Sequence, residues 1–143
     1  MEARYAIEST TTGPRPDEEK DARALNRIIR VDGTGWKYEA DRRHADIMTE
    51  AVKFKGVKGA TTPAEEEKDW EKEENEQELG PEAATKYQTL AARANYLAVD
   101  RADVQYAVKE ICRGIAEPTE GHRKKLKRLC RYLISAPGMV QIY

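Results

Sequence analysis

Two groups of residues in this 143-residue sequence have the side-chain types of a catalytic site. The first is "DRAD", Asp100 to Asp103, between two stretches of helical spacing, and the second is Asp32 in "VDGTG". An acid–base pair needs a carboxylate in a dry cleft, and two-metal phosphoryl transfer needs several carboxylates that converge on metal ions. Neither arrangement is indicated, because "DRAD" fits an ion-paired junction between helices and Asp32 fits a hairpin turn. The sequence therefore predicts no catalytic residue.

Histidine and cysteine residues are few, and their spacing matches no metal site. The candidates are His44, His122, Cys112 and Cys130. A zinc site needs closely spaced pairs of ligands, and the sequence also lacks a Gly-rich phosphate loop and a serine nucleophile elbow. Both cysteines fall at apolar positions of predicted helices, so we expect two reduced, buried thiols. We expect no metal ion and no cofactor in this chain.

The stretch "GHRKKLKRLCRYL" predicts a helix with one basic side. With Leu126 at 0° on a helical wheel, Lys127, Arg131, Lys124 and Arg128 lie at about 100° to 200°, opposite the apolar seam. We call these four bases together with Arg123 the basic ridge, which consists of Arg123, Lys124, Lys127, Arg128 and Arg131. Such a ridge can neutralise phosphates and bind nucleic acid in a salt-dependent way. A solvated basic face, neutralised by acidic residues of the same chain, explains the pattern equally well.

The charge of the chain is strongly segregated, although the formal net charge is only −1. Residues 64–82 carry ten acids against two lysines, a net charge of −8, whereas residues 109–131 carry eight bases against three acids, a net charge of +5. The acidic stretch has almost no apolar side chains and is predicted to be a disordered linker. We expect a basic region that faces a polyanion and a solvated acidic connection.

The remaining patterns predict an α+β fold. Strands are expected at residues 5–9, 25–31 and 36–38, where "DGTG" makes a hairpin turn between the last two. Apolar residues at helical spacing predict one helix after Asp41 and three helices after Pro81, and a short strand closes the chain. This gives three predicted regions: a hairpin and helix part (1–62), an acidic disordered linker (63–81) and a helical part (82–143).

The sequence indicates no membrane segment and no secretory signal. No apolar run approaches the ~18 residues that a membrane-spanning helix requires. The first residues, "MEARYAIEST", lack the apolar core of a signal peptide. We therefore expect an intracellular protein, cytoplasmic or nuclear, with no membrane partner.

The order of motifs after residue 86 resembles the end of the reverse transcriptase region in copia-type retrotransposon polyproteins. The matching elements include Tyr87, "ANYL" at 94–97, "RADV" at 101–104, "YAV" at 106–108, "EP" at 117–118, "HR" at 122–123 and "RYL" at 131–133. Residues 38–63 resemble the upstream strand, helix and Thr-Pro of the same region. Ala102 and Arg123 depart from the family, which prefers proline and tryptophan at these positions.

The resemblance implies a thumb-and-connection part of a reverse transcriptase, the part that lies before the RNase H domain. The family's Tyr-Val-Asp-Asp motif, which carries the catalytic aspartates, has no counterpart in this sequence. The chain is therefore expected to bind template–primer nucleic acid, an RNA–DNA hybrid or a DNA duplex, without catalysing polymerisation. Its protein partners would be the palm and RNase H regions of the same polyprotein, and magnesium would belong to the palm. A structural or protein-interaction module, or the remnant of a decayed element, is the alternative.

Overall fold

The computed structural model describes residues 8–52, 58–65 and 72–143 and confirms the predicted α+β layout. It divides into two compact units, one made of residues 1–40 with 140–143 and the other of residues 41–139. The helix after Asp41 therefore lies in the same unit as the C-terminal helices, whereas the sequence grouped it with the strands in region 1–62. The predicted strand at residues 5–9 falls mostly outside the described residues.

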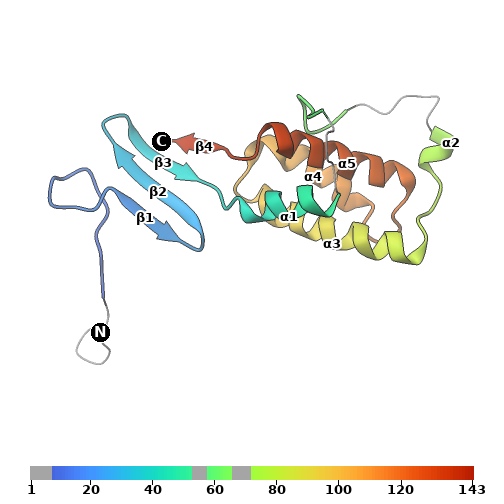
Figure 1. The fold of residues 1–143 in the computed structure, drawn as a ribbon, viewed down its shortest axis with the longest axis horizontal. Helices are drawn as coiled ribbons and strands as arrows, with labels where there is room; N and C mark the ends of the chain where they lie inside the picture. Colours follow the sequence, from blue (N-terminus) through green and yellow to red (C-terminus); the bar gives the residue numbers. More distant parts are fainter. Residues whose placement is uncertain (1–7, 53–57, 66–71) are drawn as a thin grey trace. The chain divides into compact units, whose positions relative to one another are not determined.

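The first unit contains a four-stranded antiparallel sheet in the order β1-β2-β3-β4 (Figure 1). Its strands are β1 (Asp21–Ala24), β2 (Arg27–Asp32), β3 (Gly35–Glu39) and β4 (Val140–Ile142). The predicted hairpin is correct: Val31 pairs with Trp36 and Ile29 with Tyr38, which places both aromatic side chains on one face. The terminal strand β4 completes the sheet by pairing with β3.

The start of the hairpin differs from the prediction. Leu25 and Asn26 do not belong to a strand but form the two-residue turn between β1 and β2, with φ angles of 50° and 64°. Positive φ angles at both turn residues give the twist that suits a tight hairpin. The turn requires the backbone conformation of Leu25, and its apolar side chain points into solvent, so the residue is 81% exposed.

The second unit is a helical bundle made of α1 (Arg43–Ala51), α2 (Lys72–Asn75), α3 (Pro81–Ala98), α4 (Gln105–Arg113) and α5 (Glu120–Ser135). A short 3₁₀ helix, η3 (Ala102–Val104), joins α3 to α4. The core is formed by the predicted apolar faces of α3, α4 and α5 together with two residues of α1; its fully buried members include Met48, Ala91, Ala94, Ile111, Leu129 and Cys130. Small residues on α3 let the neighbouring helices approach closely. This packing fixes which side of α5 faces outward.

Candidate nucleic-acid interface

Helix α5 presents the basic ridge because its opposite side is buried. Leu126, Leu129, Cys130 and Leu133 are all at most 3% exposed. The five ridge residues are only partly buried, as the helical wheel predicted. The first turn of α5 is fixed by His122, whose Nδ1 accepts a hydrogen bond from the Thr119 backbone N–H at 3.2 Å. The structure therefore leaves all five predicted residues partly exposed on one helix, with Lys124, Lys127, Arg128 and Arg131 opposite the buried seam.

Most of the ridge cations have partners within the chain. Arg123 pairs with Glu120 of the same helix at 2.7 Å. Lys124 Nζ lies 3.0 Å from a carboxylate oxygen of Glu74, at the end of α2. The side chain of Lys127 makes no hydrogen bond or ion pair with another described residue. The ridge is thus not a uniform row of solvated charges.

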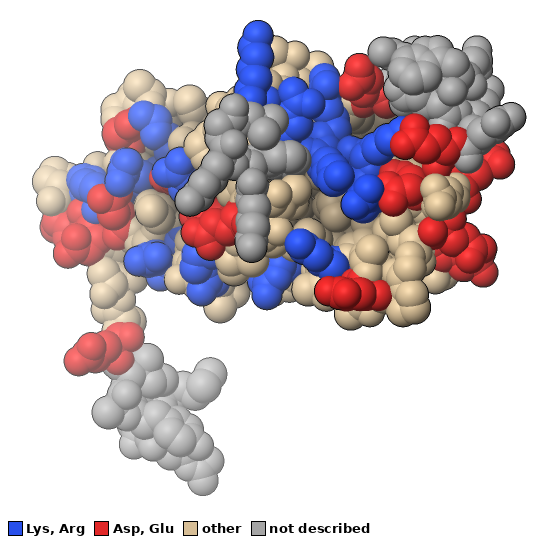
Figure 2. All heavy atoms as spheres, turned by 45° about the vertical axis from the view of Figure 1, so that its right-hand side comes forward, with Lys and Arg blue, Asp and Glu red and all other residues tan. Residues whose placement is uncertain are grey.

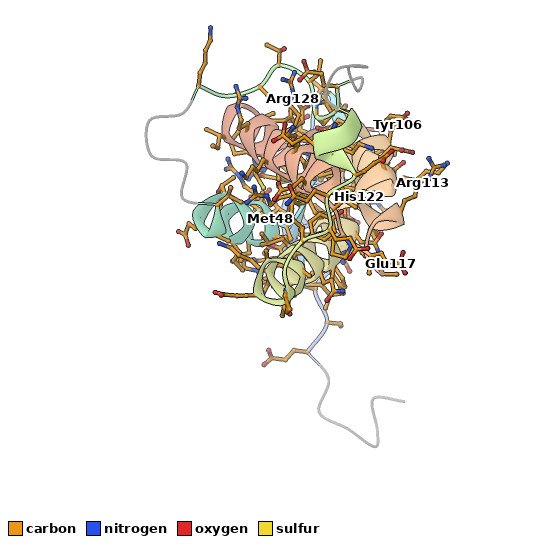
Figure 3. All side chains as sticks on the ribbon, turned by 90° about the vertical axis from the view of Figure 1, so that its right-hand side faces the viewer. Met48, Tyr106, Arg113, Glu117, His122 and Arg128 are labelled. Atoms are coloured by element: carbon orange, nitrogen blue, oxygen red, sulfur yellow. The ribbon has the colours of Figure 1, made fainter. Side chains whose placement is uncertain are left out.

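Arg128 is the most fully engaged of the ridge residues. Its Nη1 lies 2.8 Å from a carboxylate oxygen of Glu65, its Nε donates to the Thr62 carbonyl at 3.1 Å, and its Nη2 donates to Thr62 Oγ1 at 2.9 Å. Arg131 Nε donates to the Lys58 carbonyl at 3.1 Å. Figure 3 shows Arg128 on the side of α5 that faces this segment. Two ridge arginines therefore hold the chain that follows α1.

The described parts of the acidic stretch, and the residues just before it, are hydrogen-bonded to α5. The Ala60 N–H donates to the Arg131 carbonyl at 3.1 Å, and the Glu120 N–H donates to the Gln77 carbonyl at 2.8 Å. Leu79 packs against the core. The prediction of a disordered linker (63–81) therefore does not hold for residues 72–80, which the structure shows as α2 and a docked strand-like segment. Residues 66–71 lie outside the described residues.

The charge distribution on the surface reflects these contacts. Figure 2 shows Lys and Arg side chains gathered on the helical unit, with Asp and Glu side chains directly beside them. The carboxylate partners are not buried, since the side chains of Glu65 and Glu74 are 56% and 67% exposed. The pairs are therefore screened by solvent and individually weak.

The "DRAD" corner is a structural junction, as predicted. Arg101 is 1% exposed and makes two hydrogen bonds to the Asp103 carboxylate, at 2.8 and 2.6 Å, and a third to the Ala136 carbonyl at 3.0 Å. The Tyr132 hydroxyl donates to the same carboxylate at 2.8 Å. Burial acts to raise the pKa of Asp103, but the hydrogen bonds from Arg101 and Tyr132 outweigh it and hold the pKa below its usual value. This network joins the α3–α4 corner to the end of α5.

Asp32 is a turn residue, also as predicted. Its carboxylate accepts a hydrogen bond from the Thr34 N–H at 2.8 Å and pairs with Lys37 across the hairpin. These contacts hold the pKa of Asp32 far below its usual value, and the hydrogen bond from Lys37 has the largest effect. A carboxylate fixed in this way caps the turn and is not poised to take up a proton.

The cysteines and histidines form no metal site among the residues that the structure describes. Cys130 is fully buried, but Cys112 is only partly buried, so the prediction of two buried thiols holds for one of them. His122 serves the start of α5, and His44 stacks on Tyr96 with ring centroids 5.1 Å apart. In the described part of the chain, no helix is long and apolar enough to cross a membrane.

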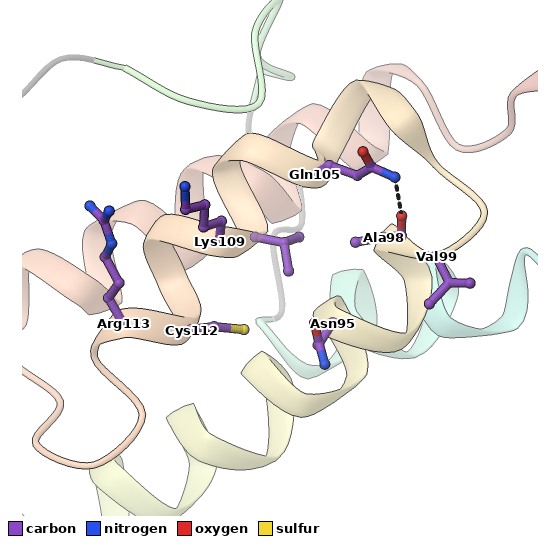
Figure 4. A pocket seen from close by; sticks show the side chains of 8 residues that line it. Asn95, Ala98, Val99, Gln105, Lys109, Cys112 and Arg113 are labelled. Atoms are coloured by element: carbon purple, nitrogen blue, oxygen red, sulfur yellow. Dashed lines mark hydrogen bonds between the residues drawn. The ribbon is translucent and has the colours of Figure 1, made fainter.

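One surface hollow, of about 550 Å³, lies between α3 and α4 (Figure 4). Its lining is mostly apolar and includes Val99, Val108 and Cys112, with Lys109 and Arg113 on its α4 side. Gln105 closes one end by donating to the Ala98 carbonyl at 3.1 Å. The lining of this hollow includes no carboxylate and no side chain activated as a nucleophile, so the hollow gives no support to an active site.

Comparison with known proteins confirms the predicted resemblance to retrotransposon Pol polyproteins. Over 54 residues, or 38% of its length, the chain is 40% identical to the retrovirus-related Pol polyprotein from transposon RE1 of Arabidopsis thaliana. It is 38% identical over 53 residues to the corresponding polyprotein from transposon RE2 of the same plant. The matched stretch covers only 4% of each of these relatives. No protein-family model and no solved structure matches the chain.

Proposed function

We propose that this chain is a non-catalytic part of the reverse transcriptase region of a copia-type retrotransposon Pol polyprotein and that it binds template–primer nucleic acid through the basic ridge of α5. The similarity to two Pol polyproteins supports the origin. The observation that carries the binding role is a set of five partly exposed cations on one helix, four of them opposite a buried seam. Nucleic-acid affinity depends first on such phosphate-neutralising cations.

The size of the ridge fits a short run of phosphates. From Arg123 to Arg131 the helix rises by about 12 Å, since each residue adds about 1.5 Å. Along one strand of a duplex, about 12 Å of axis contains three to four phosphates, at about 3.4 Å each. If three to four phosphates are neutralised, the logarithm of the binding constant should fall with the logarithm of the salt concentration with a slope of about −3.

The chemistry of the parent polyprotein belongs, in this proposal, to its other regions. The sequence contains no Tyr-Val-Asp-Asp motif, and the described residues bring no cluster of carboxylates together. The catalytic aspartates and their magnesium would lie in the palm, and RNase H would be a separate region. These regions of the same polyprotein are the proposed protein partners, inside the cell and without a membrane.

The test is to measure binding of a fluorescent RNA–DNA hybrid to the full chain at two salt concentrations. Replacing Lys124, Lys127 and Arg128 with glutamate should abolish binding while circular dichroism shows unchanged helix content. A matched control makes the same change of charge elsewhere on the helical unit, with Lys86, Arg93 and Lys109 replaced by glutamate. The control should keep most of its affinity, because the ridge is intact. No binding at low salt, even after the acids that face the ridge are neutralised, would refute the proposal.

A second function is favoured by one observation, the pairing of ridge residues with Glu65 and Glu74. In that case the ridge holds the acidic stretch in place, and the chain is a structural or protein-interaction module. The same variants separate the two functions. A structural ridge predicts that the triple glutamate variant melts at a much lower temperature and that the wild-type chain does not bind the hybrid.

A further inference from the structure

The acidic stretch is attached to α5 at both ends of the basic ridge. We use the term acidic segment for its described residues and those just before them, 58–65 and 72–80. Near the C-terminal end of α5, Ala60 is hydrogen-bonded through its backbone to Arg131. At the N-terminal end, the Leu79 N–H donates to the Pro118 carbonyl at 2.9 Å, and Gln77 accepts from the Glu120 N–H. Figure 1 shows this segment beside α5, with α2 near one end of the helix.

The side chains of the acidic segment occupy the positions that phosphates would need. Glu65 and Thr62 together use all three nitrogens of the Arg128 guanidinium. Glu74 is 3.0 Å from Lys124 Nζ. A carboxylate and a phosphate bind a guanidinium in the same way, through charge-assisted hydrogen bonds to paired oxygens. Glu65 thus neutralises the charge of Arg128, and a phosphate has to compete with it, although Nη1 and Nη2 each keep a second N–H that these bonds do not use.

We propose that the acidic segment is an intramolecular competitor of nucleic acid that covers part of the basic ridge and competes with phosphates for Arg128 and Lys124. This inference rests on the proposed function, since it concerns the same ridge. It makes the acidic segment an autoinhibitory element that lowers the affinity of the chain and discriminates against weakly charged ligands. A polyanion with closely spaced phosphates displaces the carboxylates, whereas an isolated anion does not.

The contacts have the strength that such a competitor requires. Exposed ion pairs are weak and are weakened further by salt, so the two carboxylates can be displaced by a stronger anion. The backbone hydrogen bonds at Ala60, Gln77 and Leu79 do not involve the ridge side chains. They hold the ends of the segment in place while its carboxylates exchange with phosphate.

The experiment compares hybrid binding by the wild-type full chain with binding by the Glu65→Gln, Glu74→Gln double variant. A matched control carries Glu8→Gln and Glu82→Gln, which change the net charge equally at exposed positions that contact no ridge residue in the described structure. We expect the Glu65 and Glu74 variant to bind about tenfold more tightly than both other proteins, because two weak competing pairs are lost. Its salt dependence should also be steeper by about one to two units of slope, since no carboxylates are left to take up cations on binding.

Each result separates the inference from the proposed function. Equal affinity of the double variant and its control, with clear binding by both, overturns the autoinhibitory role and leaves nucleic-acid binding in place. Absence of binding by all three proteins at low salt refutes the proposed function itself, and the inference with it. A variant that melts several degrees lower and gains no affinity would show that the two pairs are structural, which also overturns the inference.

Discussion

Replacing Asp103 with asparagine should strongly destabilise the helical unit, because it leaves a buried arginine without its counterion. Arg101 is 1% exposed, and two of its hydrogen bonds end on the Asp103 carboxylate. Removing one partner of a buried ion pair costs about 3 kcal/mol or more. In a chain of this length that loss corresponds to a fall of about 10 °C in melting temperature. Because asparagine keeps the shape of the side chain, the loss of stability measures the effect of removing the charge.

The assay is thermal and urea unfolding followed by circular dichroism, with a matched variant as the control. Glu110→Gln breaks another carboxylate–arginine pair, that with Arg113, whose side chain is 63% exposed. This control should cost less than about 1 kcal/mol, because the Arg113 guanidinium is exposed and stays solvated when the pair is lost. If Asp103→Asn destabilises the protein no more than Glu110→Gln, the reasoning about the buried corner is wrong.

The same carboxylate should make stability depend on pH. Burial opposes ionisation of Asp103, but the bonds from Arg101 and Tyr132 lower its folded-state pKa below the unfolded value of about 3.9. The folded state then binds a proton less readily than the unfolded state, so the stabilisation is complete above the unfolded pKa and is lost as the pH falls through the folded pKa. Wild-type protein should lose stability below about pH 4, and the Asp103→Asn variant should lose less over the same range.

Two further predictions concern packing around α4 and α5. Replacing Gly114 with alanine should lower the free energy of unfolding by about 1 to 3 kcal/mol, because the new Cβ would lie 2.3 Å from the His122 ring. In unfolding measurements, a second change of His122 to alanine should recover part of that loss. Burial raises the pKa of the Cys130 thiol to about 12 and also raises that of Cys112, but only Cys130 is fully buried. One thiol per chain should therefore react with a maleimide under native conditions and two in urea. Equal labelling of both thiols in the native protein would contradict the buried position of Cys130.

The helical core was predictable from sequence because it is built by side-chain periodicity. The faces of α3 and α5 that contain Leu90, Leu97, Leu126 and Leu133 are buried as expected. Strand β1 was missed because Asp21–Ala24 is short and polar and is held by backbone pairing with β2, which no side-chain pattern records. The same reason explains why the pairing of β4 with β3 could not be foreseen from a terminal strand alone.

The outward position of the basic ridge was predictable, but its partners were not. The wheel gave the direction of Lys124 and Arg128 because their helix has a clear apolar seam. Their contacts with Glu74 and Glu65 join residues 50 and 63 positions apart, and composition indicates only that opposite charges are available. The low apolar content of the acidic stretch favours disorder. Backbone hydrogen bonds to another element can still order such a stretch, and composition does not reveal them.

The order of the acidic segment therefore depends on α5 and not on the segment's own sequence. The acidic stretch, residues 64–82, carries ten acids against two lysines, so it repels itself and cannot form a core alone. What α5 supplies is a set of backbone partners at each end and a neutralising ridge between them. Neutralising Glu65 and Glu74 removes attraction to the ridge and also repulsion within the segment, so the two effects on stability partly cancel. Affinity for nucleic acid has no such cancellation, because a lost carboxylate both frees a cation and removes a charge that repels phosphate.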